Sequence, residues 1–306
     1  MTTILAIDST TEILSISISE GSRILTEIRD YKSRRHMVNI IDNLDKAFIN
    51  AGKSVKDVDA FTINLGPGDF TGGRIGISIV KIFAMLSQKP VIGFNSLDVF
   101  SAGYFFKNIG SIAEEEKKFT GIFIIPLMDV RNNEIFFSIY EIKKHKKDTE
   151  PIYEFDFKND RYYLLKKYGN FLLNSEEFRI KFPGIIHQLS VFNDDSCSKC
   201  KQIFNHSNLS DEFNAPVVNK NCNNSKKEML VVLTANCAKS YKLLLEKLKQ
   251  DVKDKQSLTE IRINEDNINP DSKYINFLAE YNFINGLKSL PIAPVYVRDF
   301  MAFSKK

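Results

Sequence analysis

The stretch DAFTINLGPGDFTGGRIG, residues 59–76, contains five of the fourteen glycines of the chain and decides its fold. Residues 59–64 are typical of a strand, 65–73 form a glycine-rich loop, and the apolar residues after them predict a helix over 74–87. Glycine lets backbone N–H groups approach a ligand closely, and a loop that opens a helix can bind an anion. Tight packing of two elements explains such a loop equally well, so the glycines alone leave phosphate binding open.

Strand and helix patterns on both sides of this stretch follow one order. Leu14, Ile16 and Ile18 alternate with serines, which predicts a half-buried strand. The first third of the chain has the order β-β-β-α-β-α, and a looser copy follows. The predicted elements are strands 3–8, 13–19, 23–30, 59–64, 90–93, 121–128, 134–142, 151–157 and 229–234, and helices 37–50, 74–87, 96–106, 238–253 and 270–288.

Two copies of this order predict an α/β chain with the two-lobed fold of the actin, sugar-kinase and heat-shock ATPase class (ASKHA-like), in tandem β-β-β-α-β-α halves. We expect a first domain over residues 1–110 and a second over 111–306. Residues 158–228 are rich in Asn, Lys, Asp and Ser without a sustained period, so we expect an irregular insertion there. The C-terminal helix 270–288 is a candidate to pack back on the first domain.

Composition and charge are those of an ordinary soluble globular protein. The 306 residues carry 42 basic and 38 acidic side chains, and the net charge of +4 is too mild to indicate a nucleic-acid binder. The sequence shows no apolar stretch long enough to span a bilayer and no signal peptide, so we expect a cytoplasmic protein without a membrane partner. The cluster Lys143–Lys147 is typical of a solvated loop or, alternatively, of a patch that contacts phosphate.

The glycine stretch taken whole is much more specific than its glycines. Residues 66–76 (GPGDFTGGRIG), the apolar helix after them and residues 90–97 (PVIGFNSL) resemble the signature of the TsaB (YeaZ) family. Segments similar to the family's opening strand and turn, its second-domain opening and its closing motif follow in the same order, at residues 4–11, 126–136 and 294–299. On these motifs the chain is identified as a member of this glycoprotease-like family.

The resemblance implies a partner protein and not an enzyme. A TsaB-like protein is understood as the non-catalytic subunit that dimerises with TsaD and activates it, in a complex that includes a TsaE-like ATPase. TsaD transfers a threonylcarbamoyl group to the adenosine 3′ of the tRNA anticodon, so tRNA is an indirect partner. TsaD holds a metal through histidines on one helix, and the corresponding residues 96–106 contain none. The resemblance therefore implies no catalytic residue and no required cofactor in this chain.

An actin-superfamily ATPase or small-molecule kinase is the alternative function. In that function Asp8 would be an acid that positions Mg²⁺. The candidate nucleotide-contacting residues are Asp8, Ser9, Thr10, Gly66, Gly68, Thr71 and Gly72, from which we expect at most a weak ATP or ADP contact within the complex. Asp69 adds negative charge where a phosphate would lie, which argues against turnover. Asp8 is equally well explained as a cap of the turn after its strand.

The predicted helices 37–50 and 74–87 carry more apolar residues than one sheet face needs. A helix that is apolar all round is buried on both sides. Deep burial within the chain is one explanation. The resemblance implies the other, an interface with TsaD or with a second copy of the chain, which allows a homodimer. The candidate interface residues are Val38, Ile41, Asp45, Phe48, Ile75, Ile79 and Phe83.

The four cysteines do not make a disulfide framework in a chain of this length. Cys197, Cys200, His206 and Cys222 have a first spacing that suits tetrahedral zinc, but the second half lacks a paired knuckle. Free thiols are the preferred explanation, so we expect no metal.

Overall fold

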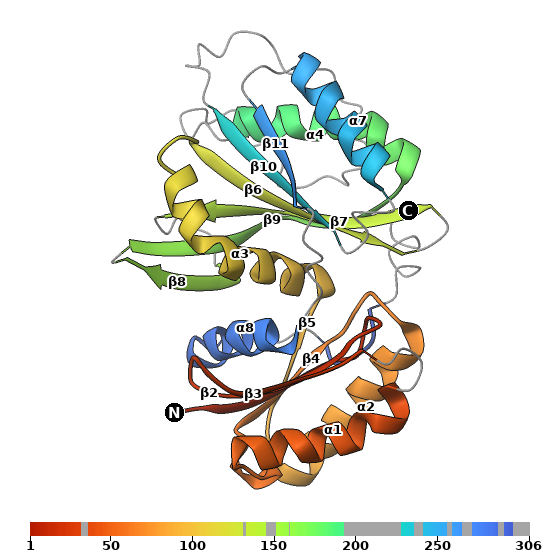
Figure 1. Ribbon diagram of the computed structural model, residues 1–306, viewed down its shortest axis with the longest axis vertical. Coiled ribbons are helices and arrows are strands. Elements are labelled where there is room, and N and C mark those ends of the chain that lie inside the picture. The colour runs from red at the N-terminus through yellow and green to blue at the C-terminus, as the bar shows by residue number, and fades with distance from the viewer. Residues whose placement is uncertain are drawn as a thin grey trace. The chain divides into compact units, whose positions relative to one another are not determined.

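Two β-sheets with helices packed on them make up the chain in the computed structural model (Figure 1). The structure describes residues 1–31, 36–130, 133–144, 151–158, 160–192, 228–235, 241–255, 259–264, 271–286 and 291–295. In chain order the elements are β1 (Thr3–Asp8), β2 (Leu14–Glu20), β3 (Arg23–Asp30), α1 (His36–Ala51), the 3-10 turn η1 (Val55–Asp57), β4 (Ala60–Asn64), α2 (Phe70–Ser87), β5 (Val91–Phe94), α3 (Ser96–Glu115), β6 (Gly121–Asp129), β7 (Glu134–Lys143), β8 (Tyr153–Phe157), β9 (Asp160–Asn174), α4 (Ser175–Phe192), β10 (Met229–Ala235), α7 (Lys242–Lys255), β11 (Thr259–Asn264) and α8 (Ser272–Ile284). The chain divides into a first unit of Met1–Lys107, Lys144–Leu165 and Ile268–Val297, and a second unit of Asn108–Lys143, Lys166–Asn267 and Arg298–Lys306.

The sheet of the first unit has the strand order β3-β2-β1-β4-β5. Strands β1, β2 and β3 form an antiparallel meander, in which Asp8 pairs with Ser15. β1 also pairs in parallel with β4, and β4 with β5, so the chain crosses over the sheet through α1 and then through α2. This connection brings the C-terminal ends of β1 and β4 to one edge of the sheet, where Asp8 and Asn64 lie.

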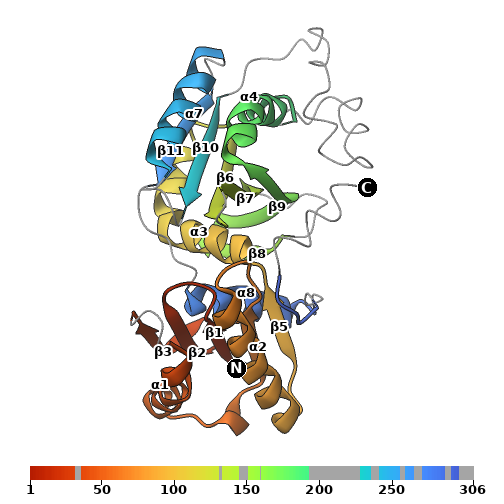
Figure 2. The same cartoon turned by 90° about the vertical axis from the view of Figure 1, so that its right-hand side faces the viewer.

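Helices cover both faces of this sheet. α1 and α2 lie side by side on one face, and α8 packs on the other (Figure 1, Figure 2). The apolar residues of β2 belong to the core under α1 and α2, while its serines face α8 and are buried as well. The prediction of a half-buried strand over 13–19 is therefore wrong. The alternation of residues 13–19 does not show that α8 covers the serine face. The first residue of α8, Ser272, which bonds to Ser15, lies 257 residues further along the chain.

The helix after the glycine loop begins earlier than its sequence indicates. α2 starts at Phe70 and not at residue 74, because the Asp69 side chain caps it by accepting a hydrogen bond from the Gly72 N–H at 2.6 Å. Contrary to the expectation from the sequence, α2 is long and apolar enough to cross a membrane by length and composition, alone among the described helices. Its buried residues, among them Ile77 and Val80, belong to the core that packs on β1 and β4.

The second sheet repeats the strand order of the first and adds one strand. Its order is β11-β10-β6-β7-β9-β8. β6 pairs antiparallel with β7 and parallel with β10, and β10 pairs in parallel with β11. The core of the second unit lies between this sheet and the helices α4 and α7, around Phe137, Phe178 and Leu248. Both halves thus consist of a meander followed by parallel strands.

Part of the predicted irregular insertion is regular structure. β9 and α4 lie within residues 158–228, and residues 193–227 are outside the described part of the chain. One side of α4 is buried through Phe178, Phe182 and Ile185. The polar residues between them obscure the helical period of apolar residues in the sequence. The sequence also does not predict β11. α8 belongs to the compact unit that contains the first sheet, which agrees with the candidate packing of helix 270–288 on the first domain.

Candidate functional site

The turn after β1 is closed by its own side chains. Asp8 Oδ1 accepts hydrogen bonds from the backbone N–H (2.9 Å) and the hydroxyl (2.7 Å) of Thr10, and Asp8 Oδ2 accepts one from Asn64 Nδ2 (2.7 Å). The first of these bonds is that of a side chain capping its own turn. The Ser9 hydroxyl donates to the Gly72 carbonyl at 2.8 Å. All three candidate side chains of this turn are buried and bond to the chain itself.

Asn64 and Ser96 join this turn to the glycine loop. Asn64 Oδ1 accepts hydrogen bonds from the Gly66 N–H and from the Ser96 hydroxyl, both at 2.9 Å. The Ser96 hydroxyl also lies 2.8 Å from the Pro67 carbonyl, and Asn64 Nδ2 lies 3.0 Å from Thr10 Oγ1. Sequence reasoning did not single out either residue. The available signal was a polar side chain at the end of a buried strand and a serine at the start of α3.

The glycines of the loop allow α2 to approach the turn after β1. A Cβ atom at Gly68 would overlap the Thr10 carbonyl oxygen, and one at Gly72 would overlap the Ser9 carbonyl oxygen. The backbone of the loop can therefore lie this close only where no side chain is present. Thr71, the remaining candidate of the loop, is exposed. The geometry accounts for Gly68 and Gly72 by packing, and a nucleotide contact at the candidate residues stays a prediction.

Burial raises the pKa of the Asp8 carboxyl from 3.8 to about 7, because the fully buried group has lost its water. The hydrogen bonds from Asn64 and Thr10 lower this pKa, and the nearby charge of Asp271 raises it. Near neutral pH a large fraction of the Asp8 side chains therefore carries a proton. Such a group, bonded at both oxygens, holds the turn in place.

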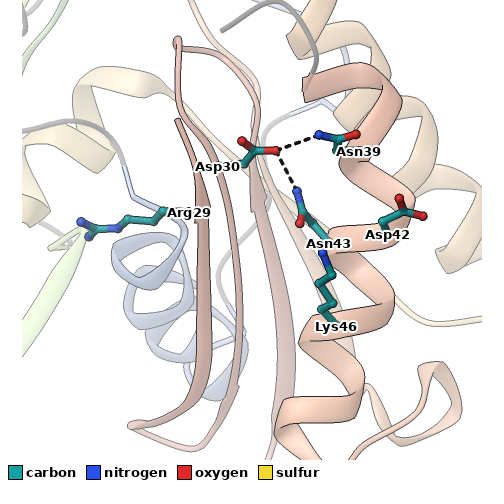
Figure 3. Close-up of a pocket in the computed structure, with 6 residues that line it drawn as sticks. All are labelled: Arg29, Asp30, Asn39, Asp42, Asn43 and Lys46. Atoms are coloured by element: carbon teal, nitrogen blue, oxygen red, sulfur yellow. Dashed lines mark hydrogen bonds between the residues drawn. The ribbon is translucent and has the colours of Figure 1, made fainter. Parts of the chain in front are cut away.

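A polar cavity of about 310 Å³ lies between the end of β3 and α1 (Figure 3). Its lining residues are Arg29, Asp30, Asn39, Asp42, Asn43 and Lys46. Asp30 Oδ2 accepts hydrogen bonds from the side-chain amides of Asn43 (3.1 Å) and Asn39 (3.4 Å). The Arg29 side chain points away from α1 and pairs with Asp271 at 2.5 Å. Polar residues at positions 39, 42, 43 and 46, on one face of α1, were the signal that could have revealed this cavity.

The outer sides of α1 and α2 expose a group of large apolar side chains. These are Ile41 and Ile49 on α1 and Ile82, Met85 and Leu86 on α2, and together they are called the α1–α2 face. Ile41 is 58% exposed and Leu86 is 73% exposed. Single exposed apolar residues are common, whereas several on two neighbouring helices make this face a candidate surface for binding another molecule.

The predicted interface residues divide into two groups. Ile41 and Asp45 are exposed on α1. The remaining described residues are half-buried and pack against the core; they are Phe48, Ile75, Ile79 and Phe83. Val38 lies in α1, but its side chain is outside the described residues. Because Met85 and Leu86 are exposed, α2 is not buried on both sides within this chain, so deep burial within the chain does not explain all of its apolar residues.

Two further candidate sites lie wholly or partly outside the described residues. The predicted zinc ligands Cys197, Cys200, His206 and Cys222 are all outside them, so zinc binding there stays untested. Within the described ranges, no group of three or more His, Cys, Asp or Glu residues could hold a metal ion. In the basic cluster, Lys143 pairs with Glu141 at 3.1 Å and Lys144 with Asp160 at 3.0 Å, while residues 145–147 are not described.

Known proteins resemble this chain in both sequence and structure. The family model described as "TsaD: tRNA N6-adenosine threonylcarbamoyltransferase" matches residues 28–267. The tRNA threonylcarbamoyladenosine biosynthesis protein TsaB of Haemophilus influenzae is 28% identical over 153 residues, which are 50% of this chain and 59% of that protein. TsaB of Escherichia coli is 26% identical over 162 residues, which are 52% of this chain and 65% of that protein. The solved structure of YeaZ from Pseudomonas aeruginosa, 16% identical, superposes with a TM-score of 0.56 over 97% of this chain and 100% of that chain.

The duplicated order of a meander followed by parallel strands defines an α/β protein of the ASKHA class, and the fold prediction is confirmed. The family model covers most of the chain. The chain therefore belongs to the tRNA N6-adenosine threonylcarbamoyltransferase family, and within it to the TsaB (YeaZ) proteins. It spans about three fifths of the length of the curated TsaB relatives that it matches.

Proposed function

We propose that this chain acts in the cytoplasm as a non-catalytic subunit that binds and activates a TsaD-like transferase. The names of its curated relatives, which describe threonylcarbamoyladenosine biosynthesis in tRNA, support this proposal. In it the TsaD-like subunit modifies the adenosine 3′ of the anticodon, and tRNA contacts this chain only indirectly. A TsaE-like ATPase joins the same complex.

The observation that carries the proposal is the α1–α2 face. Ile41, Ile82 and Leu86 are exposed, and burying a side chain of this size contributes about 1.5–3 kcal/mol. Several such side chains together can offset the entropy lost on association. Exposed charged residues such as Asp45 and Lys81 lie beside them, as expected for the polar rim of an interface. A second copy of the chain presents the same face, so self-association competes with binding of the TsaD-like subunit in this proposal.

The surroundings of Asp8 favour a partner over the alternative ATPase or kinase. An ATPase needs an acid whose oxygens can hold Mg²⁺ or the water bound to it. Both oxygens of Asp8 accept hydrogen bonds from Thr10 and Asn64 inside the chain. The apolar side chains of the α1–α2 face are exposed to solvent instead, which favours binding of a partner through them.

The proposal predicts that the chain co-purifies with the TsaD-like subunit of the same cell and that Leu86→Glu prevents this. A glutamate at position 86 is solvated in the free chain but would be buried without a partner in the complex. We expect affinity to fall at least about tenfold, measured by pull-down and analytical ultracentrifugation.

The matched control is Ile180→Glu, because Ile180 is 70% exposed on α4, outside the α1–α2 face. This variant should bind as the wild type does. The proposal is wrong if the wild-type chain does not bind the TsaD-like subunit. The interface assignment is wrong if Leu86→Glu and Ile82→Glu fold normally and still bind at wild-type strength.

A further inference from the structure

The glycine loop has the composition of an anion-binding loop, yet groups of the chain itself occupy much of it. The acceptors of its backbone N–H groups are Asn64 Oδ1 for Gly66 (2.9 Å), the Thr10 carbonyl for Asp69 (2.6 Å), Asp69 Oδ1 for Gly72 (2.6 Å) and the Asp69 carbonyl for Gly73 (3.0 Å). An anion that bound to these N–H groups would have to displace these acceptors. Each acceptor belongs to the chain itself and therefore stays close to its donor.

The Asp69 carboxylate lies where an anion would bind. The N-terminus of a helix attracts negative charge through its free N–H groups and its dipole. At the N-terminus of α2 the carboxylate accepts from the Gly72 N–H, and Asp69 is exposed to solvent. An incoming phosphate would meet a group of its own charge that already holds this donor, and like charges at such short range repel.

The neighbouring side chains that could help to bind a nucleotide interact with other groups of the chain. The Ser9 hydroxyl donates to the Gly72 carbonyl, and both oxygens of Asp8 are bonded within the turn. The Arg74 guanidinium stacks on the Phe70 ring, 3.8 Å from its centre. The residues present therefore do not fit the Mg²⁺-nucleotide that the fold class implies.

We propose that Asp69 is the specificity-determining residue of this loop: its carboxylate is a built-in anion at the N-terminus of α2 that excludes phosphate and nucleotides. This replaces the weak ATP or ADP contact expected from the sequence. The loop then serves to fix the start of α2 against the turn after β1. The proposal is independent of the TsaD-like partner, because it concerns anion binding by the isolated chain.

Two substitutions separate the charge of Asp69 from its hydrogen bond. Asp69→Asn keeps a capping oxygen and removes the charge, whereas Asp69→Gly removes both at a cost of only a few tenths of a kcal/mol in capping. Inorganic phosphate and, separately, MgATP are added at constant ionic strength. Thermal unfolding and equilibrium dialysis report binding. The matched control is Glu246→Gln, which removes one exposed carboxylate from α7.

We expect no saturable binding by the wild type and by Glu246→Gln. Asp69→Gly should bind phosphate saturably, with a half-saturation concentration at least about tenfold below the highest phosphate concentration at which the wild type shows no saturation, and Asp69→Asn should bind more weakly than Asp69→Gly. Saturable binding of MgATP or phosphate by the wild type would overturn the proposal. So would equal gains in Glu246→Gln, or the absence of binding in both Asp69 variants.

Discussion

Among single residues, Asp8 links the local structure to pH. Its pKa is raised from 3.8 to about 7 by burial, so the folded chain binds this proton more tightly than the unfolded chain does. The stability that the protonated carboxyl contributes is therefore complete below pH 3.8 and is lost as the pH rises through about 7. We predict that the free energy of unfolding falls between pH 3.8 and about pH 7, by roughly 1.4 kcal/mol for each unit of pKa difference titrated. Asp8→Asn should flatten this fall.

Urea unfolding of both proteins at several pH values and constant ionic strength measures this effect. Burial also raises the pKa of Asp271 and of Glu280, but both groups stay in the variant. The difference between the two pH profiles therefore isolates Asp8. Identical profiles for the wild type and Asp8→Asn would show that Asp8 does not titrate in this range.

At the scale of elements, polar side chains join α8 to the sheet of the first unit. Asn276 Nδ2 donates to Ser17 Oγ at 2.9 Å, and both residues are fully buried. Removing one partner leaves the other buried and unpaired, whereas replacing both by apolar groups can be nearly neutral. We predict that Ser17→Ala lowers the free energy of unfolding by about 1–3 kcal/mol and that adding Asn276→Leu restores part of the loss. Urea unfolding measures both changes.

An exposed serine provides the comparison for this pair. Ser78→Ala on α2 should change the free energy of unfolding by no more than about 0.5 kcal/mol, because Ser78 is exposed. If Ser17→Ala costs no more than Ser78→Ala, the hydrogen bond to Asn276 does not hold α8 on the sheet.

The same contact shows where sequence reasoning reaches its limit. A strand's alternation says which residues share a face, and it places Leu14, Ile16 and Ile18 together correctly. It does not say what covers the opposite face, because the cover comes from α8 at the other end of the chain. The sequence predicts a start of α2 at residue 74 because glycines usually weaken a helix. The helix nevertheless begins at Phe70 and includes Gly72 and Gly73, because Asp69 caps it. The glycine motif and the closing of the turn by Asp8 can be predicted from the sequence. The sequence also shows that Asn64 and Ser96 are polar residues at the ends of their elements, but it does not show which groups they bond.

At the scale of the whole molecule, the two candidate functions require different residues. An ATPase or kinase would need Asp8 and the glycine loop, whereas a partner subunit needs the exposed residues of the α1–α2 face. Ile79, a candidate interface residue, is half-buried against the core, so a charge there would disturb folding itself. Leu86 is exposed, and a charge there leaves the free chain solvated. Variants at Leu86 and Asp8 can therefore decide between the two functions in a living cell.

We predict that a cell whose only copy of this chain carries Leu86→Glu loses most of the threonylcarbamoyladenosine in its tRNA, at least about tenfold, because the complex no longer forms. Asp8→Asn should retain the modification, since a non-catalytic subunit needs no acid at that position. Mass spectrometry of digested tRNA measures the modified nucleoside, and immunoblotting verifies equal amounts of each variant, because a less stable chain is also less abundant. Ile180→Glu is the control with an added charge elsewhere. Loss of the modification in Asp8→Asn at wild-type abundance would mean that the chain performs chemistry, and the ATPase or kinase function would then replace the one proposed.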